Sequence, residues 1–101
     1  MTENEIISWI FLATAVASQR EPADFNSISI IADGINHAIP SHKELQTSLK
    51  WLINNGLVSK TGSKYILTEK GKMDYELASL QTSTYLKVWE NVETELKKYL
   101  A

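Results

Sequence analysis

The chain has 101 residues, of which 44% are apolar and 22% are charged, a composition typical of a globular domain rather than a disordered segment. A chain of this length builds one modest hydrophobic core, so we expect a single domain over residues 1–101. The sequence contains no cysteine, which excludes disulfides, thiolate metal sites and cysteine nucleophiles. The formal net charge of −2 by itself argues against a nucleic-acid partner.

The charges are unevenly distributed along the chain. Residues 41–72 carry six lysines and two acidic residues, a local charge of +4, whereas the remainder carries four basic and ten acidic residues, a local charge of −6. A positive segment in an acidic protein is the pattern of a small site for a polyanion. The start of the chain is acidic where a secretory signal would be basic, and the longest apolar stretch is shorter than the ~20 residues of a membrane span. We therefore expect a cytoplasmic protein that does not associate with membranes.

The first predicted element is a helix over residues 4–18. Its apolar side chains do not fit on one stripe, so this helix must be covered on more than one side. Residues 19–26, which include Pro22, are predicted to form a loop. A second helix is predicted over residues 27–38, where isoleucines recur near the helical period.

Gly34 lies inside the second predicted helix, where glycine costs about 1 kcal/mol relative to alanine. The preferred interpretation is that another chain packs closely against it. The alternative is that Asp33 and Gly34 form a turn that splits the segment.

The third predicted helix has the sharpest boundaries. Pro40 is expected to end the second helix, because the residue before a proline is disfavoured in helical conformation. Ser41 and Glu44 have the spacing of a capping box, and Gly56 is suited to the left-handed position after a helix. The buried stripe between these limits is predicted to consist of Leu45, Leu49, Leu52 and Ile53.

A hairpin and two further helices are predicted after the third helix. Residues 57–60 and 64–67 have strand character, and residues 61–63 have the chemistry of a hairpin turn. Thr68 is expected to cap a helix whose apolar positions are Met73, Leu77 and Leu80. A last helix begins near residues 82–84 and continues to the end of the chain. Its apolar positions follow the 4, 3, 4, 3 spacing of a two-heptad seam formed by Tyr85, Trp89, Val92, Leu96 and Tyr99.

Two helices, a hairpin and a helix in this order form the layout of a winged helix. The residues that make the likeness closer are Pro40-Ser41-x-x-Glu44-Leu45-x-x-x-Leu49-x-x-Leu52-x-x-x-Gly56-Leu57-Val58 and Gly62-x-x-Tyr65-x-Leu67-Thr68-x-x-Gly71. This pattern resembles the recognition helix and wing of bacterial MarR-like and PadR-like regulators. The expected fold is mainly α with a small β-hairpin wing (α+β), a winged helix-turn-helix with its core over residues 27–72. The expected function is transcription regulation through binding of double-stranded DNA.

In a DNA-binding domain of this type, the helix over residues 41–55 reads the major groove and the wing over residues 57–67 contacts the backbone. The side chains expected to reach bases or phosphates from the helix are His42, Lys43, Gln46, Thr47 and Lys50. Those expected to contact the backbone from the wing are Lys60, Thr61, Ser63 and Lys64. A solvated, lysine-bearing helix face is the alternative interpretation.

Trp51 gives a second function to consider. It is predicted on the outward face of the third helix, where it is either covered by the wing or a neighbouring loop or serves as a contact for another protein. The alternative function is therefore a protein-interaction module that docks through the Trp51 face without binding DNA.

The first and last predicted helices both need a surface to pack against. We expect them to meet, either across the two-fold axis of a homodimer, which is the preferred version, or within one chain. In the dimer, the seam residues named above form the protein contact.

No enzyme is predicted. Asp33 and His37 are one helical turn apart, but two ligands make a poor metal site, and helix-dipole stabilisation accounts for a histidine in the last turn of a helix. The sequence has no glycine-rich phosphate loop, no nucleophile elbow and no spacing that suggests paired catalytic carboxylates. We therefore expect no metal, no cofactor and no catalytic residue.

Overall fold

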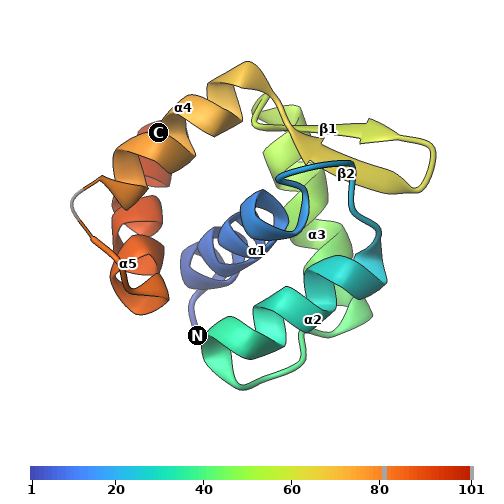
Figure 1. Cartoon of the computed structure of the whole chain (residues 1–101), viewed down its shortest axis with the longest axis horizontal. Helices are drawn as coiled ribbons and strands as arrows, with labels where there is room; N and C mark the ends of the chain where they lie inside the picture. The colour runs from blue at the N-terminus through green and yellow to red at the C-terminus, as the bar shows by residue number, and fades with distance from the viewer. Residues whose placement is uncertain (81, 101) are drawn as a thin grey trace.

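The computed structural model describes residues 1–80 and 82–100. In this part of the chain the fold is mainly helical with one small antiparallel hairpin (Figure 1). The elements in chain order are α1 (Glu3–Ala17), α2 (Phe25–Asn36), α3 (His42–Asn54), β1 (Val58–Thr61), β2 (Lys64–Leu67), α4 (Glu69–Ser79), α5 (Tyr85–Leu96) and a 3₁₀ turn, η1 (Lys97–Tyr99). The coarse prediction of an α+β fold with a single hairpin is confirmed.

Helix α1 lies at the centre of the molecule, with α2, α3 and α5 packed around it (Figure 1). Every residue from Ile7 to Ala15 is buried, so the prediction that this helix is covered on more than one side is confirmed. All the covering helices come from the same chain. The buried hydroxyl of Thr14 donates to the carbonyl of Ile10 at 2.7 Å, which satisfies its polar group inside the core.

Helix α2 begins at an Asp24 cap and ends earlier than predicted. The Asp24 carboxylate accepts a hydrogen bond from the Ser27 amide at 2.8 Å. The helix ends at Asn36 because His37 adopts a left-handed conformation with φ of 54°, so the prediction that Pro40 ends it was wrong. Gly34 is helical, and no described atom lies within 4 Å of the position that a Cβ would occupy there. Neither a turn at Gly34 nor close packing by another segment of the chain is present.

Helix α3 follows the sequence prediction at both ends. Ser41 and Glu44 form the complete capping box, with hydrogen bonds of 3.0 and 2.8 Å between the side chain of one residue and the backbone amide of the other. At the other end, Gly56 has φ of 74°, its amide donates to Ile53, and the Leu57 amide donates to the Leu52 carbonyl. This pair of bonds is a Schellman motif, and it turns the chain into β1.

The hairpin pairs Val58 with Leu67 and Thr61 with Lys64. Gly62 supplies the left-handed residue of the turn, with φ of 63°. A short bridge between Ala23 and Tyr65, with two hydrogen bonds of 2.8 Å, attaches the segment before α2 to the outer edge of β2. The sequence predicted only a loop there.

Helix α4 is capped by Thr68 as predicted, but it buries a different face. The predicted apolar positions Met73, Leu77 and Leu80 are 64%, 53% and 62% exposed, so this part of the prediction was wrong. The helix instead turns Gly71, Asp74 and Ala78 inward. Close backbone contact causes this orientation, because a Cβ at position 71 would overlap the carbonyl oxygen of Leu57.

Helix α5 packs on both α1 and α4. Val88, Val92 and Leu96 are buried, and the indole N–H of Trp89 donates to the Glu5 carbonyl at 3.0 Å. The Trp89 ring lies 6.2 Å from that of Trp9, measured between ring centroids. The terminal helices therefore pack together within one chain, which is the alternative that the sequence left open. The final residue of the predicted 82–101 helix lies outside the described residues.

None of the helices in the described ranges combines the length and the apolarity needed to cross a bilayer.

Candidate functional site

A groove of about 880 Å³ runs between α3, the hairpin and the start of α2. Gln46, Thr47 and Lys50 line it from α3, and Lys60 and Ser63 line it from the hairpin. The groove is therefore lined by five of the nine residues predicted to contact DNA, three from α3 and two from the hairpin.

The core fixes the orientation of the α3 side of the groove. Leu45, Leu49 and Leu52 are buried at 4%, 1% and 0% exposure, so the opposite face of the helix points outward. Gln46, Thr47 and Lys50 lie on that outward face and are exposed. His42 and Lys43, in the first turn, are exposed as well but do not line the groove.

The hairpin forms the other wall of the groove. The Lys60 ammonium lies 5.7 Å from the centroid of the Tyr65 ring, which holds the lysine above the groove floor. Thr61 and Lys64, the remaining predicted contacts, form the last pair of the hairpin and are exposed beside the groove.

The floor of the groove is apolar and was not predicted from the sequence. The rings of Phe25 and Tyr65 stack with 5.5 Å between centroids and 11° between planes, and His42 meets the edge of Phe25 at 5.1 Å. Leu49 and Ile53 contribute the aliphatic part of the floor. Phe25 was placed in a loop. An available signal was the capping residue Asp24 directly before it, which marks the true start of α2.

Asp24 places an acidic group among the basic ones. Its carboxylate lines the groove beside Asn26, and the hydrogen bond from the Ser27 amide lowers its pKa below the usual range, with a further contribution from the charge of Lys64. The groove therefore combines hydrogen-bond donors and lysines with one permanently charged acceptor at neutral pH.

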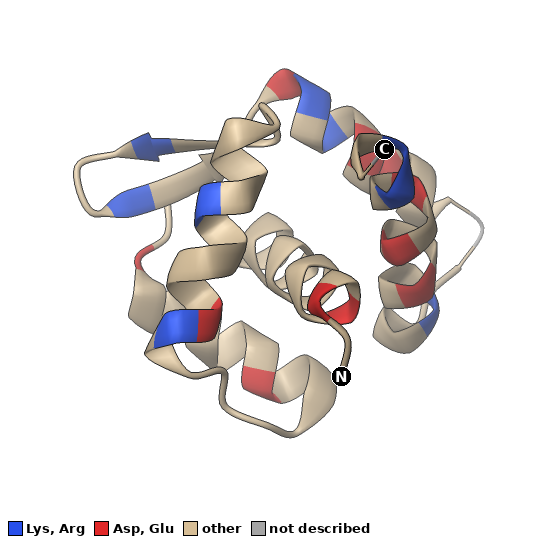
Figure 2. Ribbon diagram, turned by 180° about the vertical axis from the view of Figure 1, so that it is seen from behind, with Lys and Arg blue, Asp and Glu red and all other residues tan. Residues whose placement is uncertain are grey.

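Four of the six lysines in the positive segment lie on α3 and the hairpin. These are Lys43 and Lys50 on α3, Lys60 on β1 and Lys64 on β2. In Figure 2, α3 and the hairpin carry their blue segments on one side of the molecule. The acidic residues of α5 lie on the other side (Figure 2). Lys70 and Lys72 lie on α4 instead, where Lys70 donates to the Asn55 carbonyl at 3.1 Å and Lys72 lies 3.7 Å from Glu69.

Trp51 does not extend freely from α3. It is half-buried, and its ring meets that of Tyr99 edge-on at 6.4 Å between centroids. Its aromatic neighbour Tyr99 comes from η1, a segment that was not expected from the sequence as a cover for Trp51.

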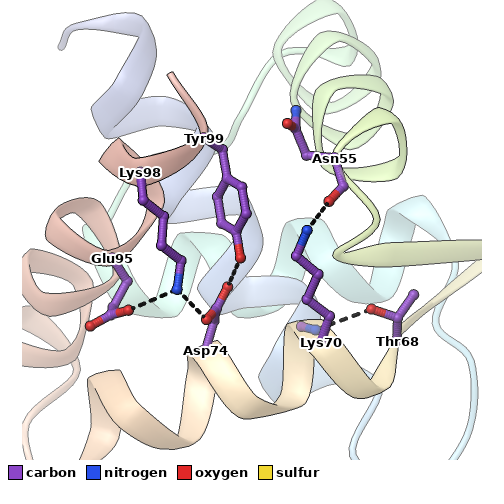
Figure 3. A network of polar contacts seen from close by, with 8 residues as sticks. Asn55, Thr68, Lys70, Asp74, Glu95, Lys98 and Tyr99 are labelled. Carbon is purple, nitrogen blue, oxygen red and sulfur yellow. Dashed lines mark hydrogen bonds and ion pairs between the residues drawn. The ribbon is translucent and has the colours of Figure 1, made fainter. Parts of the chain in front are cut away.

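Tyr99 is itself held by a polar network centred on Asp74 (Figure 3). The Asp74 carboxylate is 5% exposed and accepts hydrogen bonds from the Tyr99 hydroxyl at 2.6 Å and from the Lys98 ammonium at 2.8 Å. The Lys70 ammonium lies 4.5 Å above the Tyr99 ring. These contacts hold η1 against α4, and the contact between Tyr99 and Trp51 holds it against α3. Trp51 and Tyr99 are the predicted functional residues in this cluster.

The residues of the predicted terminal seam have three different environments. Val92 and Leu96 are buried at 1% and 0% exposure against the protein's own core, which leaves them unavailable to a partner of the folded chain. Trp89 and Tyr99 are half-buried, and Tyr85 is 52% exposed. Val92 and Leu96 therefore serve the fold of one chain.

Asp33 and His37 lie at the end of α2, on and directly after its last turn. His37 is the left-handed residue after α2, and its amide donates to the Asp33 carbonyl at 2.7 Å. Within residues 1–80 and 82–100, no three histidine or carboxylate side chains are grouped so that they could hold a metal ion.

Comparison of the sequence with protein-family models and with curated proteins, and of the structure with solved structures, found no match.

Proposed function

We propose that this chain is a winged helix-turn-helix domain that binds double-stranded DNA, as a transcription regulator does. The groove carries the proposal, because it brings the polar face of α3 and the hairpin residues Lys60 and Ser63 around one space. A helix that is fixed to the core by one face and free on the other has the arrangement of helices that enter the major groove.

Each side chain has a chemical role in this proposal. Gln46 and Thr47 hydrogen-bond to base edges, and Lys50 reaches a phosphate or a guanine. Lys43 and His42 contact the duplex from the first turn of α3. The residues that contact the backbone from the hairpin are Lys60, Thr61, Ser63 and Lys64.

The electrostatics set the expected strength of binding. Four lysines on this face neutralise at most about four phosphates, so the logarithm of the affinity falls with the logarithm of the salt concentration with a slope no steeper than about −3.6. The chain is acidic overall, and α3 contains no arginine, which makes the commonest specific contact with guanine. We therefore expect binding that is measurable at low salt and weak at physiological salt for a mixed sequence.

The test is fluorescence anisotropy of a labelled duplex titrated with the protein at low and moderate salt. The test variant is Lys50→Glu/Lys60→Glu, which reverses two charges in the groove. The matched control is Lys87→Glu/Lys97→Glu, which makes the same change in net charge on α5 and η1.

We expect the wild type and the control to bind with the same salt dependence, and the groove variant to lose binding. The proposal fails if the wild type does not bind at low salt. It also fails if both double variants lose affinity equally, because the effect would then reflect net charge rather than the groove.

Protein binding at the same face is the second candidate function, and the apolar floor is the observation that favours it. Phe25 and Ile53 are half-buried and are the floor residues that a partner can contact, whereas Leu49 and Tyr65 are 1% and 6% exposed. Absence of DNA binding in the anisotropy experiment would direct attention to this floor.

A further inference from the structure

Helix α4 and its C-cap residue carry a row of apolar side chains that are more than half exposed. Met73, Leu77 and Leu80 are 64%, 53% and 62% exposed, although they have the 4 and 3 spacing of a helix-packing seam. We call these three residues the α4 stripe. The helix lies along the outer edge of the molecule in Figure 1. Its buried residues contact Leu57, η1 and α5. Exposed apolar residues in such a row are characteristic of a contact surface rather than of scattered surface leucines.

We propose that the α4 stripe docks against the α4 stripe of a second copy of this chain, with the two helices antiparallel. A two-fold axis that passes between Met73 and Leu77 places the Met73 of one copy opposite the Leu77 of the other, and the reverse pair follows by symmetry. Such a contact covers the same apolar surface on both copies.

The charges beside the stripe favour a second copy as the occupant. Lys72 and Glu76 are one helical turn apart and lie on the same flank of the stripe. In the antiparallel contact, the Lys72 of one copy is displaced along the helix axis from the partner's Glu76 by two residues, about 3 Å. Each dimer therefore gains two Lys72–Glu76 pairs of opposite charge against one Glu76–Glu76 pair of like charge, which has the same displacement of two residues. Attractive pairs thus outnumber repulsive ones along this flank of the contact.

Both charged residues are available for this pairing. Within the chain, Lys72 lies 3.7 Å from Glu69, and the two side chains are 52% and 92% exposed, so this ion pair is weak. Glu76 is exposed and has no ion pair among the described residues.

This surface is different from the one expected from the sequence. The terminal helices α1 and α5 already pack on each other, whereas α4 is the helix whose expected apolar face is left uncovered. The contact uses three apolar residues of each copy, which corresponds to a small interface, so we expect a weak dimer with a micromolar dissociation constant.

Sedimentation velocity of the full chain over a range of micromolar concentrations tests the proposal, with no DNA present. The wild type should pass from monomer to dimer as its concentration rises. Leu77→Glu should remain monomeric, because it places a charge in the centre of the contact. Leu86→Glu is the matched control, since Leu86 is 63% exposed on α5 outside the stripe, and it should dimerise as the wild type does.

Charge reversal tests the antiparallel pairing. Lys72→Glu and Glu76→Lys should each raise the dissociation constant on the order of tenfold, and the double variant should restore it. A wild type that stays monomeric overturns the proposal and leaves the stripe to a different partner. A dimer that survives Leu77→Glu, or a double variant that is not restored, overturns it as well. DNA binding and dimerisation are measured separately, so either proposal can fail without the other.

Discussion

At the scale of single residues, Asp74 is the polar group on which the end of the chain depends. Its carboxylate is buried and accepts two short hydrogen bonds, whereas the side chain of Glu95, the second acidic partner of Lys98, is 31% exposed. A buried acceptor that holds two donors contributes more than an exposed ion pair, because its loss leaves desolvated groups without partners.

We expect Asp74→Asn to lower the free energy of unfolding by about 1–3 kcal/mol, since the amide cannot accept from both Lys98 and Tyr99 as a carboxylate does. The matched change Glu95→Gln should alter it by less than about 0.5 kcal/mol. Urea denaturation followed by circular dichroism measures both values. Equal effects of the two variants would contradict the importance of Asp74.

The same network predicts a loss of stability in alkali. Burial and the hydrogen bond to Asp74 raise the pKa of Tyr99 above its ordinary value of 10.0, and the hydrogen bond to Asp74 raises the pKa of Lys98. The folded state therefore retains these protons when the unfolded state has lost them, so stability falls as the pH rises above about 10. In Asp74→Asn this fall should be shallower, because both pKa values return toward those of the unfolded chain. An unchanged slope in the variant would count against this assignment.

At the scale of secondary-structure elements, two helical glycines have opposite roles. Gly71 lets α4 lie against the backbone of Leu57, whereas Gly34 on α2 has open space where a Cβ would be. Both glycines lie inside helices, and helix propensity alone assigns them the same cost. The difference depends on which segment packs on each helix.

We expect Gly71→Ala to destabilise the protein by about 1–3 kcal/mol, because α4 must move away from Leu57 to accommodate the methyl group. Gly34→Ala should instead stabilise it by about 0.5–1 kcal/mol, the difference in helix propensity between the two residues. Thermal unfolding of the two variants beside the wild type measures both effects. Destabilisation by Gly34→Ala would indicate that a second chain packs at that site.

The capping signals were the most informative local features of the sequence. Ser41, Glu44, Gly56 and Thr68 all act in the structure as their positions predicted, because a cap is formed by residues within a few positions of each other. The end of α2 was missed because a left-handed histidine is uncommon, and the sequence around His37 gives no specific signal for it.

At the scale of the whole molecule, α5 is part of the core. It covers α1 on the side that α2 and α3 leave open, which explains how so apolar a central helix is buried in a chain of this size. The predicted core over residues 27–72 therefore omitted α5 and also α1, which contributes more buried side chains than any other described helix.

We expect Leu96→Ala to lower the free energy of unfolding by about 2–5 kcal/mol, because Leu96 is fully buried and its truncation leaves a cavity. Leu86→Ala on the exposed side of the same helix should change it by less than about 0.5 kcal/mol. Denaturant titration compares the two variants. A small effect of Leu96→Ala would mean that α5 contributes little to the stability of the single chain.

The sequence by itself determined the features that depend on neighbouring residues. These are the helical nature of residues 4–18, both ends of α3, the hairpin with its turn and the cap of α4. It also identified the outward face of α3, because Leu45, Leu49 and Leu52 define a stripe whose opposite side must be exposed.

Only the tertiary structure decided how these elements meet. It joined Phe25 and Tyr65 into the floor of the groove and placed Tyr99 over Trp51. It also turned α4 so that Asp74 lies inside and Leu77 lies outside. The reason is physical: periodicity shows that a helix has an apolar side, whereas the side that is buried depends on contacts between residues far apart in the chain, such as Gly71 with Leu57.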